Sequence, residues 1–129
     1  MAITWSNLDD WSVRATCTTG TETPSGATAG LNLASGTDNA SRPVRYVEIH
    51  VKPTTASTAI TAGTIDIYSY NPFMALWNKV GSYDVAAQSN DIGVALPAME
   101  VAPVGRMAAV PTGLGVAVTL DMYGTPEAP

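Results

Sequence analysis

Apolar and polar side chains alternate at every second position in several short stretches of the chain, most clearly in RYVEIHVK at residues 45–52. Val47, Ile49 and Val51 would share one face of an extended segment, as in a β-strand with one buried face. Further predicted strands lie at 64–70, 76–80, 82–85, 106–110 and 115–123, with weaker candidates at 12–19 and 30–33.

Turn-forming residues separate these segments at short intervals. Asn71-Pro72 and Asn90-Asp91 are turn signals, and Gly81 is expected to join the strands on either side of it. No segment keeps helical spacing of its apolar residues over ten positions without a Gly or Pro. Short strands without intervening helices predict an all-β antiparallel sandwich, and we expect a jelly-roll-like topology.

The chain of 129 residues suits one domain, residues 1–129. Residues 1–13 have poor helix propensity and are expected to form an extended N-terminal arm. Residues 18–41 are rich in Thr, Gly, Ser and Ala, which predicts a long surface loop with one short strand. Residues 124–129 are expected to be a tail, because prolines do not join a central strand ladder.

Charge is scarce, since only 13% of the residues are charged and the net charge is −5. A free protein usually keeps a more charged surface, so we expect this surface to be partly covered by other protein. The acidic balance argues against nucleic acid as a partner. We expect no secretory signal, and no apolar run approaches the roughly 18 residues of a membrane span.

The bridge between two of the predicted strands, Lys52–Thr64, carries no charge from residue 53 to residue 65. An exposed tip beside well-formed strands usually carries charges that prevent aggregation. We therefore expect this bridge to be a hairpin tip or crossing loop, with Ala59 and Ile60 packed against another protein.

Aromatic residues supply the other candidate contacts. Trp5, Leu8 and Trp11 recur at steps of three near the N-terminus. The two tryptophans either close one end of the sandwich or anchor this segment to a neighbouring subunit, where tryptophan is a preferred anchor.

Three tyrosines fall on the outward faces of two strands that we expect to be adjacent. Tyr46, Tyr68 and Tyr70 could form a platform that stacks on a sugar. They could equally be buried against a second subunit, since tyrosine is enriched in interfaces. The low charge favours the second interpretation.

Catalytic patterns are weak throughout. The single histidine, His50, lies two positions after Glu48, and Asp66 on the strand expected to face them could complete a metal site. An ordinary ion pair explains the two residues as well. Cys17 could form a dyad with His50, but a buried apolar role suits a lone cysteine among threonines. We expect no enzymatic activity, no metal and no cofactor.

Four segments within roughly residues 44–124 stand out in an Ala/Thr/Gly-rich, cysteine-poor chain: RYVEIHVK, AGTIDIYSYN, LWNKVGSYDV and GRMAAVPTGLGVAVTLDMYG. In these features the chain resembles the small jelly-roll decoration, or cement, proteins of tailed-bacteriophage capsids. The resemblance implies a virion protein, made in the host cytoplasm, that binds the outer capsid surface and bridges major capsid protein subunits. No site residue carries over from this family.

A homotrimer is the expected assembly. Linked copies multiply a modest contact with the shell, and closed threefold symmetry matches positions that an icosahedral shell offers. The alternatives are a tail or head-fibre component, a carbohydrate-binding or adhesin module, and a small cupin-like enzyme.

Overall fold

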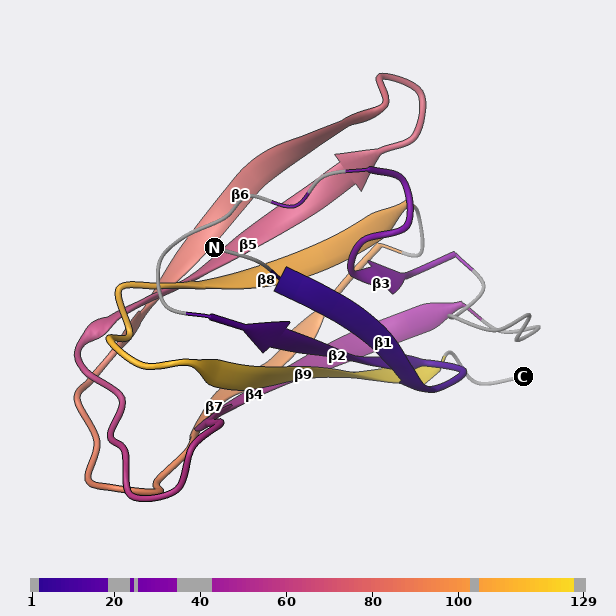
Figure 1. Cartoon of the computed structure of the whole chain (residues 1–129). Coiled ribbons are helices and arrows are strands. Elements are labelled where there is room, and N and C mark those ends of the chain that lie inside the picture. Colours follow the sequence, from indigo (N-terminus) through magenta and orange to yellow (C-terminus); the bar gives the residue numbers. More distant parts are fainter. Residues whose placement is uncertain (1–2, 19–23, 25, 35–42, 103–104, 127–129) are drawn as a thin grey trace.

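The computed structural model describes residues 3–18, 24, 26–34, 43–102 and 105–126. These residues form nine strands and no helix (Figure 1). The strands are β1 (Ile3–Asp9), β2 (Ser12–Cys17), β3 (Leu31–Asn32), β4 (Val44–Pro53), β5 (Gly63–Asn71), β6 (Leu76–Val85), β7 (Val94–Glu100), β8 (Arg106–Thr112) and β9 (Val118–Pro126). Within this described part, no helix is present that could span a membrane.

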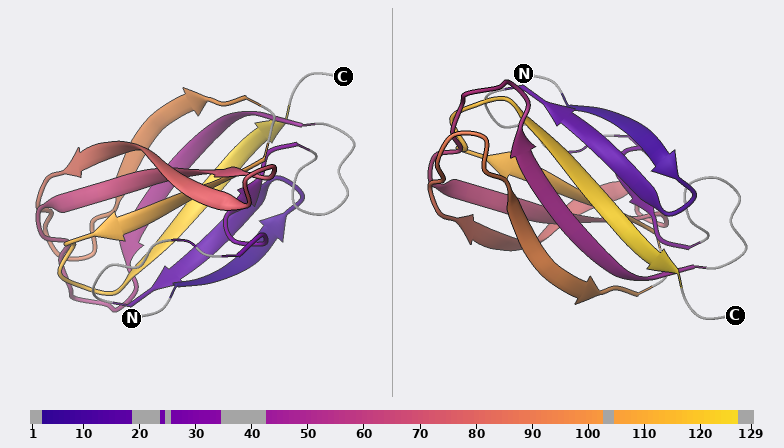
Figure 2. Two further views of the ribbon diagram at one scale, coloured as in Figure 1. Left: turned by 90° about the horizontal axis from the view of Figure 1, so that it is seen from above. Right: turned by 90° about the horizontal axis from the view of Figure 1, so that it is seen from below.

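The strands form two antiparallel sheets. One sheet has the order β1-β2-β9-β4-β7 and the other the order β3-β8-β5-β6. Figure 2 shows them as two layers, with the five-stranded sheet in front in the view from below. The predicted all-β antiparallel sandwich is confirmed, while the jelly-roll-like topology stays a prediction.

The core lies between the two sheets and is built by the alternation seen in the sequence. Val47, Ile49 and Val51 of β4 are buried in it, as are Ile65 and Ile67 of β5 on the opposite sheet. Strands with one apolar face pack in this way because burial removes that face from water. The outward residues of β4 are exposed to solvent, as the period of two requires.

Residues 3–9 of the predicted N-terminal arm, 1–13, form a strand of the sheet, which corrects the expectation of an extended arm; residues 1 and 2 lie outside the described part. β1 pairs antiparallel with β2, from Ile3 opposite Cys17 to Asp9 opposite Ser12. The Asp9 carboxylate accepts the Trp11 N–H at 2.8 Å and so closes the turn between the strands. Poor helix propensity pointed correctly away from a helix, but the partner strand was not recognised.

The expected tail also belongs in part to the sheet. Residues 124–126 end β9, and Pro126 pairs with Val44 of β4. β2 accompanies β9 only as far as Tyr123, so one side of β9 has no neighbouring strand at the proline, which lacks an N–H to donate. The last three residues, 127–129, lie outside the described part.

Within the loop-rich segment 18–41, the weak strand predicted near residues 30–33 appears as the short β3. β3 pairs with the start of β8 through Leu31 opposite Met107. Residues 19–23, 25 and 35–42 lie outside the described part, so the rest of this prediction is untested.

Candidate interaction surface

Three connections cross from one sheet to the other at the same end of the sandwich. Residues 54–62 join β4 to β5, residues 86–93 join β6 to β7, and residues 113–117 join β8 to β9. We call these three segments the loop end; they lie at the left and lower left of Figure 1. The bridge that the sequence marked as uncharged is therefore a crossing loop and not a hairpin tip.

Hydrogen bonds join the three loops into one surface. They run from Thr61 N to Leu114 O at 2.9 Å, from Gln88 N to Ile60 O at 2.9 Å, from Asp91 N to Thr58 O at 3.0 Å, and from Ser57 N to Asp91 Oδ1 at 2.8 Å. Each loop is thus held by a neighbour rather than by solvent. A surface fixed in this way loses little conformational freedom when a partner covers it.

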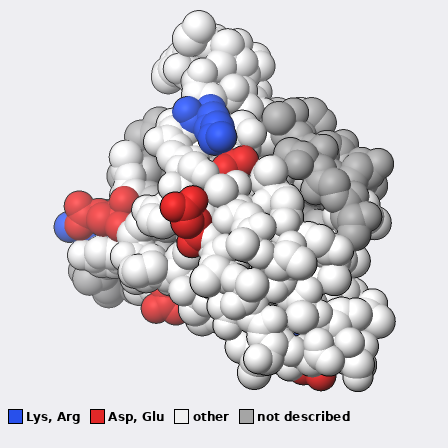
Figure 3. Space-filling model, turned by 90° about the vertical axis from the view of Figure 1, so that its left-hand side faces the viewer, with Lys and Arg blue, Asp and Glu red and all other residues white. Residues whose placement is uncertain are grey.

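The loop end carries one charged residue, Asp91. Its carboxylate already accepts the Ser57 N–H. The corresponding lower lobe in Figure 3 is almost entirely free of coloured charges. Ile92 beside Asp91 is 49% exposed, so the surface combines small neutral residues with one large apolar side chain.

Of the two residues predicted to pack against a partner here, only Ala59 is accessible. Ile60 is 1% exposed and belongs to the core of its own sandwich. The prediction that Ile60 is a surface contact is therefore wrong. The loop turns inward at this residue and places its side chain between the sheets, while its carbonyl accepts the Gln88 N–H.

The N-terminal candidates separate into packed and exposed residues. Trp5 and Trp11 are half-buried and pack against the core of their own sandwich. Leu8 is exposed on β1, which is one of the two edge strands of its sheet. The contact of Trp5 and Trp11 with their own domain argues against a role as free anchors.

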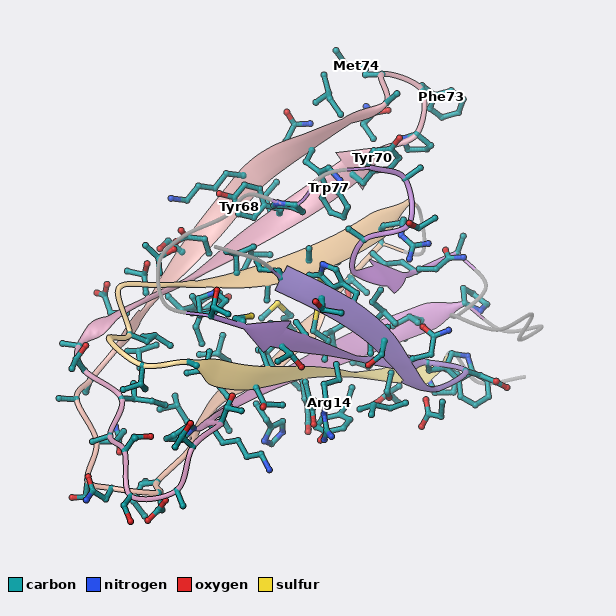
Figure 4. All side chains as sticks on the ribbon, in the orientation of Figure 1. Arg14, Tyr68, Tyr70, Phe73, Met74 and Trp77 are labelled. Atoms are coloured by element: carbon teal, nitrogen blue, oxygen red, sulfur yellow. The ribbon has the colours of Figure 1, made fainter. Side chains whose placement is uncertain are left out.

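The three tyrosines do not share a face. β4 and β5 belong to different sheets, which corrects the expectation that they are adjacent. Tyr46 on β4 is exposed, with the Arg45 guanidinium 5.8 Å from its ring centre. Tyr68 is buried, and Tyr70 lies against Trp77 with ring centres 5.2 Å apart (Figure 4). The structure therefore contains no platform of these three rings for a sugar.

The expected metal ligands are also separated. His50 Nε2 lies 3.4 Å from the Glu48 carboxylate on the outer face of the five-stranded sheet. Asp66 belongs to the other sheet, where the hydroxyls of Thr64, Ser82 and Thr112 donate to its carboxylate. Among the described residues, no three His, Cys, Asp or Glu side chains gather closely enough to hold a metal ion.

Asp66 is a buried carboxylate stabilised as an anion. Burial raises its pKa, but hydrogen bonds from Ser82 and Thr112, the nearby Lys79 ammonium and the hydrogen bond from Thr64 outweigh burial and leave the pKa below its ordinary value. Lys79 Nζ lies 3.6 Å from the carboxylate. These contacts link β5 to β6 and β8, which are three of the four strands of this sheet.

A second carboxylate, Asp121, organises the outer face of the five-stranded sheet. Arg14 donates to it twice, at 2.7 and 2.9 Å, and the Tyr123 hydroxyl donates at 2.6 Å. The hydrogen bond from Arg14 holds the pKa of Asp121 below its ordinary value against the effect of burial. His50 and Lys52 line a shallow hollow of about 420 Å³ beside this cluster. Arg14 belongs to β2 and Asp121 to β9, so the cluster joins these two strands.

The cysteine and the histidine do not form a dyad. Cys17 is buried in the core, whereas His50 is exposed on the outer face of the sheet. Burial raises the pKa of the Cys17 thiol to about 11. The thiol therefore stays protonated at neutral pH and acts as an apolar core side chain.

Sequence reasoning missed the most exposed apolar residues. Phe73 and Met74, at the turn between β5 and β6, are 94% and 65% exposed. Asn71-Pro72 had marked the turn, but no sequence signal showed that the hairpin end projects from the sandwich, as it does at the top of Figure 4. No sequence signal showed the exposure of Ile92 at the loop end either.

Comparison of the chain with models of protein families, with curated proteins and with solved structures finds no match. The fold and the surface therefore carry the functional argument. They describe a β-sandwich with a rigid, nearly uncharged loop end and a projecting apolar hairpin. Such surfaces are typical of proteins that contact other proteins.

Proposed function

We propose that this chain is a structural virion protein that binds the outer surface of a bacteriophage head. There it stabilises contacts between neighbouring major capsid protein subunits. The observation that carries the proposal is the loop end, where three crossing loops from both sheets form one hydrogen-bonded and nearly uncharged surface.

The loop end suits burial against protein for two physical reasons. Its backbone is already fixed, so docking costs little ordering of the loops. It carries one charge, so little charge has to be removed from water. Burial of apolar area contributes roughly 25 cal/mol per Å², and a standard interface buries about 800 Å² on each side.

The place on a phage head rests on the resemblance of this chain to capsid decoration proteins. The two-sheet antiparallel architecture agrees with that resemblance, and the jelly-roll connectivity is part of the same proposal. A tail or head-fibre location is the nearest alternative. The carbohydrate-binding alternative loses its basis, because the three tyrosines lie apart.

Co-sedimentation with capsids tests the proposal. We expect a major capsid protein to be encoded near the gene of this chain, and the purified chain is mixed with heads assembled from that protein. We expect saturable binding, and we expect Ala59→Lys and Ile92→Lys to weaken it at least about tenfold, because each places a charge in the covered surface.

Thr4→Lys is the matched control, because it adds the same charge at an exposed position of β1. It should bind heads as the parent does. Imaging of the decorated heads then shows whether the bound chain lies on their outer surface. Absence of parent binding to such heads contradicts the proposal, and equal binding of all three variants contradicts the role of the loop end.

A further inference from the structure

The turn of the β5–β6 hairpin presents two apolar side chains in a fixed conformation. The Asn71 carboxamide oxygen accepts the N–H groups of Phe73 and Met74 at 2.9 and 3.1 Å. These bonds fix the turn from within. We call residues 71–76 the hairpin tip; it projects beyond the sandwich (Figure 1).

The strands next to the hairpin tip are held in place as well. Trp77 packs on Tyr70 across the two strands, and its indole N–H donates to the Gly26 carbonyl at 3.0 Å. The hairpin tip is therefore a rigid apolar projection rather than a loose loop. Such a preorganised aromatic anchor is characteristic of protein contacts.

An apolar groove lies on the open side of the same molecule. It forms where β6 and β7, the edge strands of the two sheets, lie beside each other without pairing. The groove has a volume of about 390 Å³. Its apolar lining includes Leu33, Ile67, Val80, Met99, Val101 and Met107.

The charge and flexibility of the groove suit an apolar side chain. Among the described residues that line it, Glu100 is the one with a charge, and the Arg45 guanidinium lies 3.2 Å from that carboxylate. Met99 and Met107 are side chains that adapt to the shape of what they contact. An exposed apolar projection and an apolar groove of the same chain thus match in chemistry.

The hairpin tip cannot reach the groove of its own molecule. Ser69 is the groove-lining residue of this hairpin that is nearest to Phe73 in the sequence, and it is four positions away, or roughly 13 Å of extended strand. Pairing of β5 with both β6 and β8 keeps this hairpin extended. The groove can therefore accept a hairpin tip only from another molecule.

We propose that the hairpin tip of one copy docks into the groove between β6 and β7 of a second copy. This self-association goes beyond capsid binding, because it involves only copies of this chain. Each copy keeps a free tip and a free groove, so the contact runs head to tail. It closes into a ring where the rotation between copies permits, and a three-membered ring would be the homotrimer expected from the sequence.

A concentration series in sedimentation velocity, without capsids, tests the contact. The parent should associate as concentration rises. Phe73→Ser should weaken association about tenfold or more, because it removes the apolar side chain that is buried. Ile92→Ser at the loop end is the matched control and should associate as the parent does.

Gly81→Arg blocks the groove in a second variant. Gly81 lines the groove, and a Cβ added there meets nothing within 4 Å. Gly81 lies directly opposite Ile67, and side chains at opposite positions share a face of the sheet. Ile67 faces the core and also lines the groove, so the arginine side chain would point into the groove. Circular dichroism checks that each variant keeps its fold.

Mixing the two variants gives the sharpest result. At a concentration just sufficient for the parent to associate, each variant alone should stay monomeric, whereas the mixture should form a heterodimer of one copy each, since one intact tip and one intact groove remain. A parent that stays monomeric throughout the series overturns the proposal. So does a mixture that remains two monomers, or an Ile92→Ser control that weakens association as much as Phe73→Ser. None of these outcomes bears on capsid binding, which the co-sedimentation measures separately.

Discussion

At the scale of single residues, each sheet has a buried carboxylate on its outer face that accepts hydrogen bonds from side chains around it. Asp121 holds Arg14 and Tyr123 on the five-stranded sheet, and Asp66 collects three hydroxyls on the four-stranded sheet. Both pKa values lie below the ordinary value for aspartate. Each residue therefore makes the stability of the fold depend on pH.

Because both folded-state pKa values are lowered, the two carboxylates stabilise the fold above the unfolded value of about 3.9. That contribution is lost as the pH falls from about 3.9 through the folded values. We expect the free energy of unfolding to fall in this range, and Asp121→Asn to lower stability at pH 7 and flatten the acid dependence. Urea unfolding at a series of pH values measures both effects. An unchanged acid dependence in Asp121→Asn would contradict this account.

Ile60 gives a second prediction at this scale. Its side chain is 1% exposed, so Ile60→Ala leaves a cavity and should lower the free energy of unfolding by about 2–5 kcal/mol. Ala59→Gly, at the half-buried neighbouring position, should cost less than about 1 kcal/mol. Denaturant unfolding of the two variants measures the difference. Equal effects would show that Ile60 is not part of the core.

At the scale of the strands, the alternation of apolar and polar residues predicted where strands lie better than which strands pair. The segments 45–52 and 64–70 correspond to β4 and β5. The expectation that these two strands are adjacent was wrong, because a period of two marks a buried face but does not show which strand lies beside it. β7 was missed, since Pro97 interrupts its pattern, and an edge strand tolerates a proline.

Gly81 shows a related error. It was expected to be a turn, yet β6 runs through it, and the register shift at Val80 is a β-bulge. Glycine suits both a turn and a bulge, so the sequence did not distinguish them. For the candidate surface, the sequence predicted the uncharged bridge but not which of its residues are buried. The burial of Ile60, and the exposure of Phe73 at the hairpin tip, depend on tertiary packing.

The β1–β2 hairpin carries the prediction at the scale of elements. Trp5 packs against core residues, so Trp5→Ala should lower the free energy of unfolding by about 2–3 kcal/mol, less than for a fully buried tryptophan. Leu8→Ala on the same strand is the control and should change it by less than about 0.5 kcal/mol, since Leu8 is exposed. Thermal unfolding compares them. A parent-like Trp5→Ala would restore the idea of an N-terminal arm independent of the domain.

At the scale of the whole molecule, the scarcity of charge determines how assembly should respond to salt. The loop end carries one charged residue. Contacts between uncharged surfaces are not screened by ions. We expect the affinity for heads to change less than about threefold between 0.05 and 0.5 M salt. Co-sedimentation at both concentrations measures this. A steep loss of binding at high salt would indicate that charged residues outside the loop end make the contact.

The direction of the last strand has a practical consequence. β9 starts beside the loop end at Val118 and runs to Pro126 at the opposite end of the sandwich (Figure 1). A molecule that rests on a shell by its loop end therefore points the end of β9 outward. A peptide or fluorescent domain fused to the C-terminus would be displayed to the medium, one for each bound copy. The chain would then serve as a carrier for presenting foreign proteins on assembled particles.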